Sequence, residues 1–272
     1  MEEKRKKYHR GRRKKKTKKQ IARQVISTIV LVVALVVFCI SAFKLYEIFH
    51  GYHEGESEYE ELEEIAIINK GKEGSEEERF QVDFDALKEI NKDVVGWIRF
   101  EEPAVISYPV VQGRDNAEYL YKTFKGYDNT VGSIFVNAYN NPDFKDQNTI
   151  IYGHYMNNGT MFNELDQYAE KAFWEQHPYF YIYTPDGTEL QYHIYSAGVV
   201  KDTSESYIYQ FADEAAFAEF VKITRDASNY DTGIEVGEDA QIVTLSTCTK
   251  DNNDDRFVVH AVKVAERRQE DE

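Results

Sequence analysis

The sequence predicts a mainly β domain, a barrel or sandwich with a few added helices, preceded by one transmembrane helix. Short apolar segments separated by turn residues recur through the second half of the chain, and two segments with helical spacing interrupt them. One long uncharged apolar run lies near the N-terminus. With 42% hydrophobic and 14% aromatic residues among 272, the chain can bury an ordinary core, which excludes a disordered protein.

The first 24 residues are strongly basic, with 13 Lys and Arg residues against two Glu, although the whole chain carries a net charge of -15. The uncharged run Val25 to Phe43 follows and is about as long as a helix that crosses a bilayer. Basic flanks stay on the cytoplasmic side, so the rest of the chain is expected to face outward, with the lipid bilayer as a partner. A nucleic-acid-binding tail and a cleaved signal peptide are the alternatives; the adjoining span and its length argue against them.

An acidic stretch poor in core residues follows the apolar run. It mixes a possible short helix with a Gly/Ser-interrupted spacer and is expected to hold the domain away from the membrane. The predicted organisation is a basic cytoplasmic tail (1–24), a transmembrane signal anchor (25–45), an acidic extracellular linker (46–79), a folded domain (80–268) and a polar C-terminal tail (269–272).

The folded domain is expected to begin with an aspartate-capped helix in DFDALKEI, with apolar Leu87 and Ile90, followed by a strand around Val94 to Phe100. Later strands include a hairpin whose turn is the Pro-Asp-Gly at 185–187. Helical spacing marks residues 160–177 and Asp213 to Ala227. In the second of these helices the residues expected on one face are Phe217, Phe220, Val221 and Thr224. The remaining strand-like segments are AVISYPVVQ, GSIFVN, NTIIYGH, AQIVTLSTC and RFVVHAVKV.

The two cysteines cannot form a disulfide framework, because Cys39 lies in the apolar run and Cys248 in the outward domain. Cys39 follows the bulky Phe38, where lipid-modified cysteines need a small residue, so it is interpreted as an apolar side chain of the span. Cys248 is either buried and inert or retained for its reactivity. A thiol becomes a nucleophile when an imidazole or a positive charge favours the thiolate.

His154 is the strongest candidate for that imidazole. It directly follows the apolar strand NTIIYG and opens the loop HYMNNGT, a position that is rigidly held and still accessible. Taken alone, a surface loop histidine explains it equally well. The other histidines lie in the tail, beside the apolar run, before a proline or inside strands: His9, His50, His53, His177, His193 and His260.

Arg256 is the candidate cation. It opens the final strand eight residues after Cys248, and the intervening TKDNNDD is long enough for the chain to return antiparallel. The cysteine and the arginine would then lie on neighbouring strands, although an arginine at a strand start is usually only a solvated charge. The DNNDD run lacks the glycine and the distal glutamate of a calcium loop, so a solvated loop is expected.

The segments TLSTC (244–248), RFVV (256–259) and IIYGH (150–154) resemble three motifs of the sortases, membrane-anchored cysteine transpeptidases of Gram-positive bacterial surfaces, and they occur in the family's order. The resemblance covers roughly Phe80 to Ala265. The serine within TLSTC, the helix before the cysteine strand and the helical sequence ahead of the barrel resemble class B. The lid motif and second span of class C are not found. One departure is Asn137, which stands where many members have Asp.

The resemblance implies a sortase-type eight-stranded β-barrel with His154, Cys248 and Arg256 as catalytic residues. Ser246 and Thr247 would contact substrate, although strand packing explains them as well. The enzyme would cleave a sorting-signal pentapeptide of surface proteins through a thioacyl intermediate and transfer them to an amine of a peptidoglycan precursor. No cofactor, metal or nucleic acid is implied. The alternatives are a pilin-polymerising sortase or thiol hydrolase on the same fold, and a non-enzymatic surface module with a structural Cys248.

Overall fold

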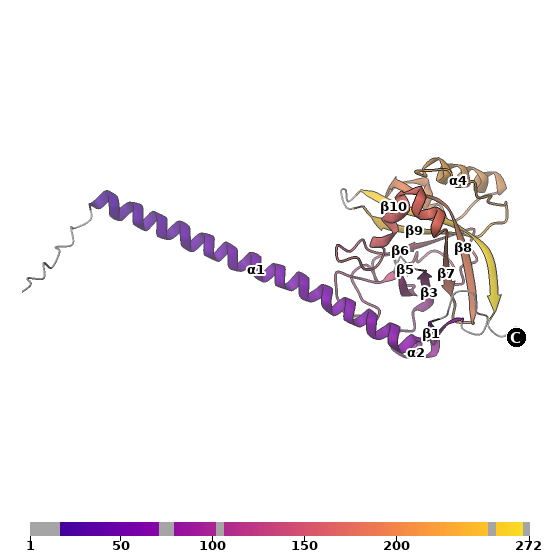
Figure 1. Ribbon diagram of the computed structural model, residues 1–272, viewed down its shortest axis with the longest axis horizontal. Coiled ribbons are helices and arrows are strands. Elements are labelled where there is room, and N and C mark those ends of the chain that lie inside the picture. The colour runs from indigo at the N-terminus through magenta and orange to yellow at the C-terminus, as the bar shows by residue number, and fades with distance from the viewer. Residues whose placement is uncertain (1–16, 71–78, 102–105, 250–253, 269–272) are drawn as a thin grey trace, which may run out of the picture. The chain divides into compact units, whose positions relative to one another are not determined.

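A computed structural model describes residues 17–70, 79–101, 106–249 and 254–268, which divide into two compact units, residues 1–50 and residues 51–272. The second unit contains a closed eight-stranded barrel in the order β10-β8-β7-β3-β4-β5-β6-β9 (Figure 1). This confirms the expected fold class. The barrel strands are β3 (Val94–Phe100), β4 (Ser107–Val111), β5 (Ile134–Val136), β6 (Asn148–Tyr152), β7 (Tyr179–Tyr183), β8 (Thr188–Lys201), β9 (Ile242–Cys248) and β10 (Asp255–Arg268).

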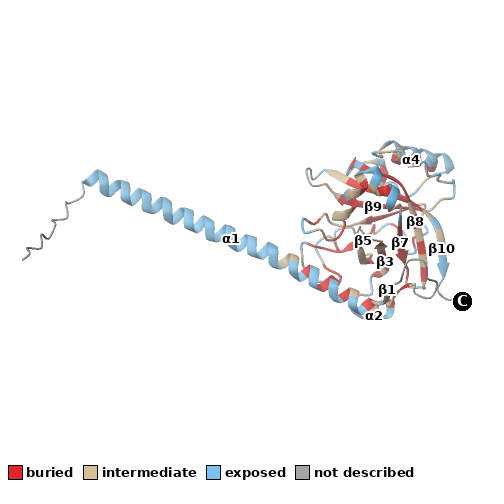
Figure 2. Ribbon diagram, in the orientation of Figure 1, coloured by how far each residue is buried: buried red, intermediate tan, exposed pale blue. Residues whose placement is uncertain are grey.

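The first unit consists of the start of the long helix α1 (Lys18–Ala66). This helix is long and apolar enough to cross a membrane, and residues 17–50 are exposed throughout, including the uncharged run from Val25 to Phe43 (Figure 2). Contiguous apolar surface of this extent marks a site of contact with a membrane or another protein, and this helix is a candidate membrane span.

The end of α1 belongs to the second unit and packs against the barrel. Gly55, Tyr59, Leu62 and Ala66 are buried at intervals of three or four residues, so one face of the helix turns inward. A short sheet of β1 (Ile67–Lys70) and β2 (Phe80–Val82) follows. The end of α1 is therefore a packed helix within the range 46–79, where the sequence predicts a spacer. Its buried residues lie on one face, and most of the other positions of this segment are polar and rich in glutamate. Residues 71–78 of that range lie outside the described residues, as do most of the basic tail and the C-terminal tail 269–272.

The predicted local elements of the domain are largely confirmed. Helix α2 (Phe84–Ile90) is capped by Asp83, whose carboxylate accepts a hydrogen bond from the Ala86 amide at 2.9 Å. The hairpin about 185–187 joins β7 to β8. The segment 160–177 forms two short helices instead of one, η1 (Asn163–Ala169) and α3 (Lys171–Gln176).

A long connection between β8 and β9 covers the outer surface of the barrel. It contains η2 (Glu205–Tyr207) and helix α4 (Glu214–Asp226), and the four residues predicted on one face of α4 are all buried. The aromatic residues of that face pack with side chains of β8, β9 and β10 in a second hydrophobic cluster, formed by Tyr195, Phe217, Phe220, Val221, Ile242 and Val262. The outer side of β9 is therefore partly covered, and the residues at its C-terminal end line a cavity.

Candidate active site

Strand register brings the three predicted catalytic residues to one end of the barrel. Arg256 is the direct cross-strand partner of Cys248 in the antiparallel pair β9–β10. Strand β6 runs parallel to β9 with Tyr152 opposite Ser246, so His154 and Cys248 each follow two residues after that pair. The Gly153 amide continues the ladder by donating to the Ser246 carbonyl at 3.1 Å. The convergence predicted from the sequence motifs therefore follows directly from the sheet.

A cavity of about 220 Å³ lies at this end of the barrel. It is lined by Asn116, Leu120, Phe135, Tyr152, Gly153, His154, Ser246, Thr247, Cys248 and Arg256. All five residues predicted for the site are in its wall. The sequence analysis assigns no site role to four other lining residues, Asn116, Leu120, Phe135 and Tyr152, although all four lie within the part of the chain that resembles the family.

The His154 imidazole is held by a backbone carbonyl. Its Nε2 lies 2.6 Å from the Leu120 oxygen, and a carbonyl oxygen only accepts, so Nε2 carries a proton. The Tyr121 ring lies beside it, with centroids 5.7 Å apart. Nδ1 is then the nitrogen that takes up or gives a proton.

Cys248 and Arg256 are both only partly buried. Cys248 is a free thiol of intermediate exposure, which excludes a fully buried, inert side chain. The Arg256 side chain is 24% exposed; its Nη1 donates to the Asp255 carbonyl at 3.0 Å and its Nη2 lies 4.0 Å from Asp202 Oδ2. The guanidinium is thus oriented by the first residue of β10 and by the start of the β8–β9 connection.

Ser246 and Thr247 are more deeply buried than Cys248. Each is about 2% exposed. The Ser246 hydroxyl lies 2.8 Å from the Tyr207 hydroxyl, and burial raises the Tyr207 pKa to about 12, so that phenol stays neutral. Thr247 Oγ1 is buried without a hydrogen-bond partner in the described part of the chain. Alternation along β9 places Ser246 on the same face as Cys248 and Thr247 on the other.

A buried polar chain fixes the segment that carries Tyr207. Asn148 Nδ2 donates to the Ile208 carbonyl at 2.7 Å, and the Thr244 hydroxyl donates to Asn148 Oδ1 at 2.7 Å. Thr244 Oγ1 lies 2.9 Å from His260 Nδ1, and because its hydrogen is already used, the histidine is the donor. His260 is fully buried, and burial lowers its pKa to about 3. It is a neutral structural histidine that does not line the cavity.

Asn137, the departure from the family pattern, is also structural. It is buried, and its Oδ1 accepts from Asn116 Nδ2 at 3.2 Å and from the Tyr139 amide at 3.1 Å. The Asn116 side-chain oxygen in turn accepts from the Ala138 amide at 2.8 Å. Asn137 therefore supports the cavity wall through Asn116, and the cavity lining does not include it.

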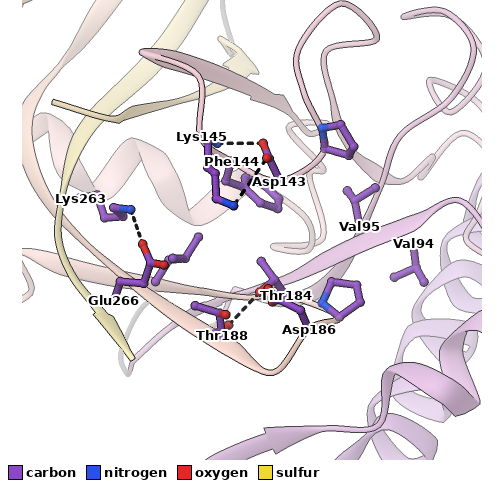
Figure 3. Close-up of a pocket in the computed structure, with 13 residues that line it drawn as sticks. Val94, Val95, Asp143, Phe144, Lys145, Thr184, Asp186, Thr188, Lys263 and Glu266 are labelled. Atoms are coloured by element: carbon purple, nitrogen blue, oxygen red, sulfur yellow. Dashed lines mark hydrogen bonds and ion pairs between the residues drawn. The ribbon is translucent and has the colours of Figure 1, made fainter. Parts of the chain in front are cut away.

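A larger cavity of about 370 Å³ lies away from these residues (Figure 3). Its wall includes Lys263 and Glu266, near the end of β10. Lys263 is seven residues along the strand from Arg256, roughly 23 Å at about 3.3 Å a residue. The charged side chains in the wall of this larger cavity form two ion pairs: Lys145 Nζ is 3.8 Å from Asp143, and Lys263 pairs with Glu266. This cavity holds neither the thiol nor the imidazole.

The comparisons with known proteins agree with one another. A Sortase domain model matches residues 101–264. The chain is 35% identical over 178 residues to sortase B of Listeria monocytogenes, covering 64% of this chain and 70% of that protein. It is 30% identical over 222 residues to sortase B of Staphylococcus aureus, covering 81% and 88%. The crystal structure of sortase B from B. anthracis in complex with AAEK1 superimposes with a TM-score of 0.68 at 32% identity, covering 80% of this chain and 99% of that one.

Proposed function

Because this chain belongs to the class B sortases, we propose that it is a membrane-anchored enzyme that cleaves a sorting-signal pentapeptide of surface proteins and joins those proteins to a cell-wall amine. A sortase is a cysteine transpeptidase of the cell surface. The observation that carries the proposal is the convergence of Cys248, His154 and Arg256 on one cavity from three adjacent strands.

In the first half-reaction the Cys248 thiolate attacks the carbonyl carbon after the threonine of the signal. The resulting tetrahedral oxyanion collapses, the carbon–nitrogen bond breaks, and protonated His154 gives its Nδ1 proton to the leaving amine. The product is a thioester on Cys248. In the second half-reaction the acceptor amine attacks that thioester, neutral His154 takes the proton from the amine, and the thiolate leaves. The imidazole ends protonated, ready for the next substrate.

Arg256 is placed to stabilise the oxyanion and to hold the peptide. As the cross-strand partner of Cys248, it extends from the neighbouring strand at the same level as the thiol. The contacts to Asp255 and Asp202 hold the guanidinium before substrate arrives, so little reorganisation is needed as charge develops.

Ser246 and Thr247 are proposed to contact the substrate over a small surface only. Their side chains are almost fully enclosed, so a peptide reaches them only at the cavity surface. Ser246 acts mainly through Tyr207, whose neutral hydroxyl it holds beside the cavity.

The two substrates are supported by solved relatives. One structure is a Staphylococcus aureus sortase B–substrate complex, and another is a sortase B complexed with triglycine. We infer that this chain likewise takes a signal peptide and an amine, the latter from a peptidoglycan precursor.

The membrane arrangement is part of the same proposal. The candidate span within α1 would anchor the protein, with the basic residues 1–24 in the cytoplasm and the barrel outside. The residues 80–268 hold the complete cavity, and the end of α1 packs on them.

The test uses the full chain in detergent micelles and quenched fluorescent peptides of LPxTG, NPxTN and SPxTG type, with and without triglycine. Cys248→Ala is the control. Cysteine-dependent cleavage with ligation to triglycine supports the proposal and identifies the signal. Cleavage that yields only the free acid indicates a thiol hydrolase, and ligation to a lysine-bearing pilin peptide instead of triglycine indicates a polymerase. No cleavage by folded protein overturns the proposal and favours a non-enzymatic surface module.

A further inference from the structure

The end of α1 contacts one particular segment of the barrel, residues 119–133 between β4 and β5. The Gly51 carbonyl accepts from Asn129 Nδ2 at 2.9 Å, and the Glu58 carboxylate accepts from the Lys125 amide at 2.8 Å. The next residue along the helix, Tyr59, donates through its hydroxyl to the Gly132 carbonyl at 2.6 Å. Two positions on the helix, about two turns apart, therefore hold different parts of the same segment.

The same segment holds the His154 imidazole. The carbonyl that accepts from His154 Nε2 belongs to Leu120, near the start of the segment. Gly132, near its end, approaches both groups: a Cβ added there would lie 2.6 Å from the Leu120 oxygen and 3.0 Å from His154 Cδ2. The Ser133 amide donates to the Tyr119 carbonyl at 3.1 Å, so the two ends of the segment are bonded to each other beside the ring.

Tyr59 is the side chain through which the helix reaches this arrangement. It is 7% exposed, and its ring packs edge-on against Tyr108 with centroids 5.4 Å apart. Its hydroxyl also lies 3.2 Å from Ser133 Oγ, which itself donates to the Lys122 carbonyl at 2.8 Å. Burial raises the Tyr59 pKa, so the hydroxyl keeps its proton and remains a donor.

We propose that residues 51–66 of α1 are a positioning element of the active site, and that Tyr59 is a positioning residue that fixes the His154 imidazole through Gly132 and Leu120. The inference rests on the proposed role of His154 as acid and base. Proton transfer requires hydrogen-bond distance between donor and acceptor, and small misplacements lower the rate steeply. The catalytic rate then depends on the packing of the helix that also carries the candidate membrane span.

The test is Tyr59→Phe in the full chain in detergent micelles, with Tyr127→Phe as the matched control. Tyr127 lies in the same segment and is 66% exposed, so the same chemical change there removes no buried bond. Loss of one buried hydroxyl bond predicts that kcat for peptide cleavage falls about 3- to 10-fold with KM within about twofold. Tyr127→Phe is expected to match wild type. Ser133→Ala, which removes the second partner of Tyr59, is expected to lower kcat in the same direction by less.

A second measurement needs no substrate. In a Cys39→Ala background, the rate of Cys248 alkylation by iodoacetamide is followed against pH, because the reagent attacks the thiolate and its formation is sensitive to how the imidazole is placed beside the thiol. Tyr59→Phe is expected to move the midpoint of this pH profile, and Tyr127→Phe to leave it unchanged. Unchanged kcat and an unchanged midpoint in Tyr59→Phe overturn the inference. A rise in KM with lower thermal stability and no shift of the midpoint also overturns it, because that pattern indicates a purely structural role.

The two proposals fail in different ways. If wild type cleaves no peptide, the transpeptidase proposal fails, and the alkylation midpoint still decides whether the helix positions His154. If Tyr59→Phe does not fold, Asn129→Ala replaces it, since it removes a bond to the same helix from a half-buried residue of the same segment. If wild type cleaves the peptide and both Tyr59→Phe and Asn129→Ala match it in kcat and in the midpoint of the alkylation profile, only the helix inference fails.

Discussion

Acidification should destabilise the barrel measurably through His260. The imidazole is fully buried, and its pKa is about 3 in the folded protein against about 6.5 in an unfolded chain. At a pH between these two pKa values the unfolded state binds a proton on His260 and the folded state does not. The free energy of unfolding therefore falls as the pH falls from about 6.5, by about 1.4 kcal/mol for each pH unit. At pH 5 the loss from this one group is about 2 kcal/mol.

The assay compares wild type with His260→Leu by urea denaturation of the full chain at pH 7 and pH 5. The two tryptophans of the sequence, Trp97 and Trp174, are both buried in the barrel unit, so their fluorescence follows that unit alone. His193, whose pKa is also lowered by burial, and the carboxylates are present in both proteins, so their effects cancel in the difference.

The expected outcome is that wild type loses about 2 kcal/mol more than His260→Leu between pH 7 and pH 5. A difference in stability between the two proteins at pH 7 does not affect the result, because only the change with pH enters the comparison. An equal loss in both proteins would show that His260 is already protonated in the folded state or open to water, and would refute the reasoning from burial.

Three further outcomes follow from the site and its supports. Arg256→Ala is expected to lower kcat for peptide cleavage on the order of 100-fold, with partial recovery in Arg256→Lys, and equal rates in Arg256→Ala and wild type would exclude a role in oxyanion stabilisation. Gly153→Ala is expected to cost about 1 to 3 kcal/mol in urea denaturation and to lower kcat, because the new Cβ would lie 2.6 Å from the Phe162 ring; an unchanged midpoint would contradict the close packing. Thr244→Val is expected to cost about 2 to 5 kcal/mol, since it leaves Asn148 Oδ1 and the buried imidazole donor without these partners, and a loss below about 1 kcal/mol would argue against the buried chain.

The strands of the site were predictable because their sequence patterns are local. TLSTC and RFVV are apolar strands joined by a polar loop, and this predicts that Cys248 and Arg256 lie on adjacent strands, as the register shows. The placement of His154 depends on the family resemblance, because its strand pairs in parallel with β9 between residues 94 apart in sequence, Asn148 with Ile242. No periodicity within either segment encodes that pairing.

The residues that hold the site in place are not marked by a recognisable sequence pattern. Leu120 holds His154 through its backbone oxygen, and any residue has that group. The glutamate-rich surface of the helix that packs on the barrel indicates a spacer with a possible short helix, although Tyr59, Leu62 and Ala66 are spaced for one buried face. Such a face is recognisable only when the burial partner is known, because three apolar positions in an acidic stretch also suit an exposed helix.

The parallel pairing of β6 with β9 also governs when the chain becomes reactive. Contacts between residues so distant in sequence form late and slowly during folding, because a long loop must close before they stabilise anything. The imidazole and the thiol meet only after β9 has paired with β6. Until then, Cys248 has no imidazole beside it, so the nucleophile and its acid–base partner are assembled only in the folded barrel.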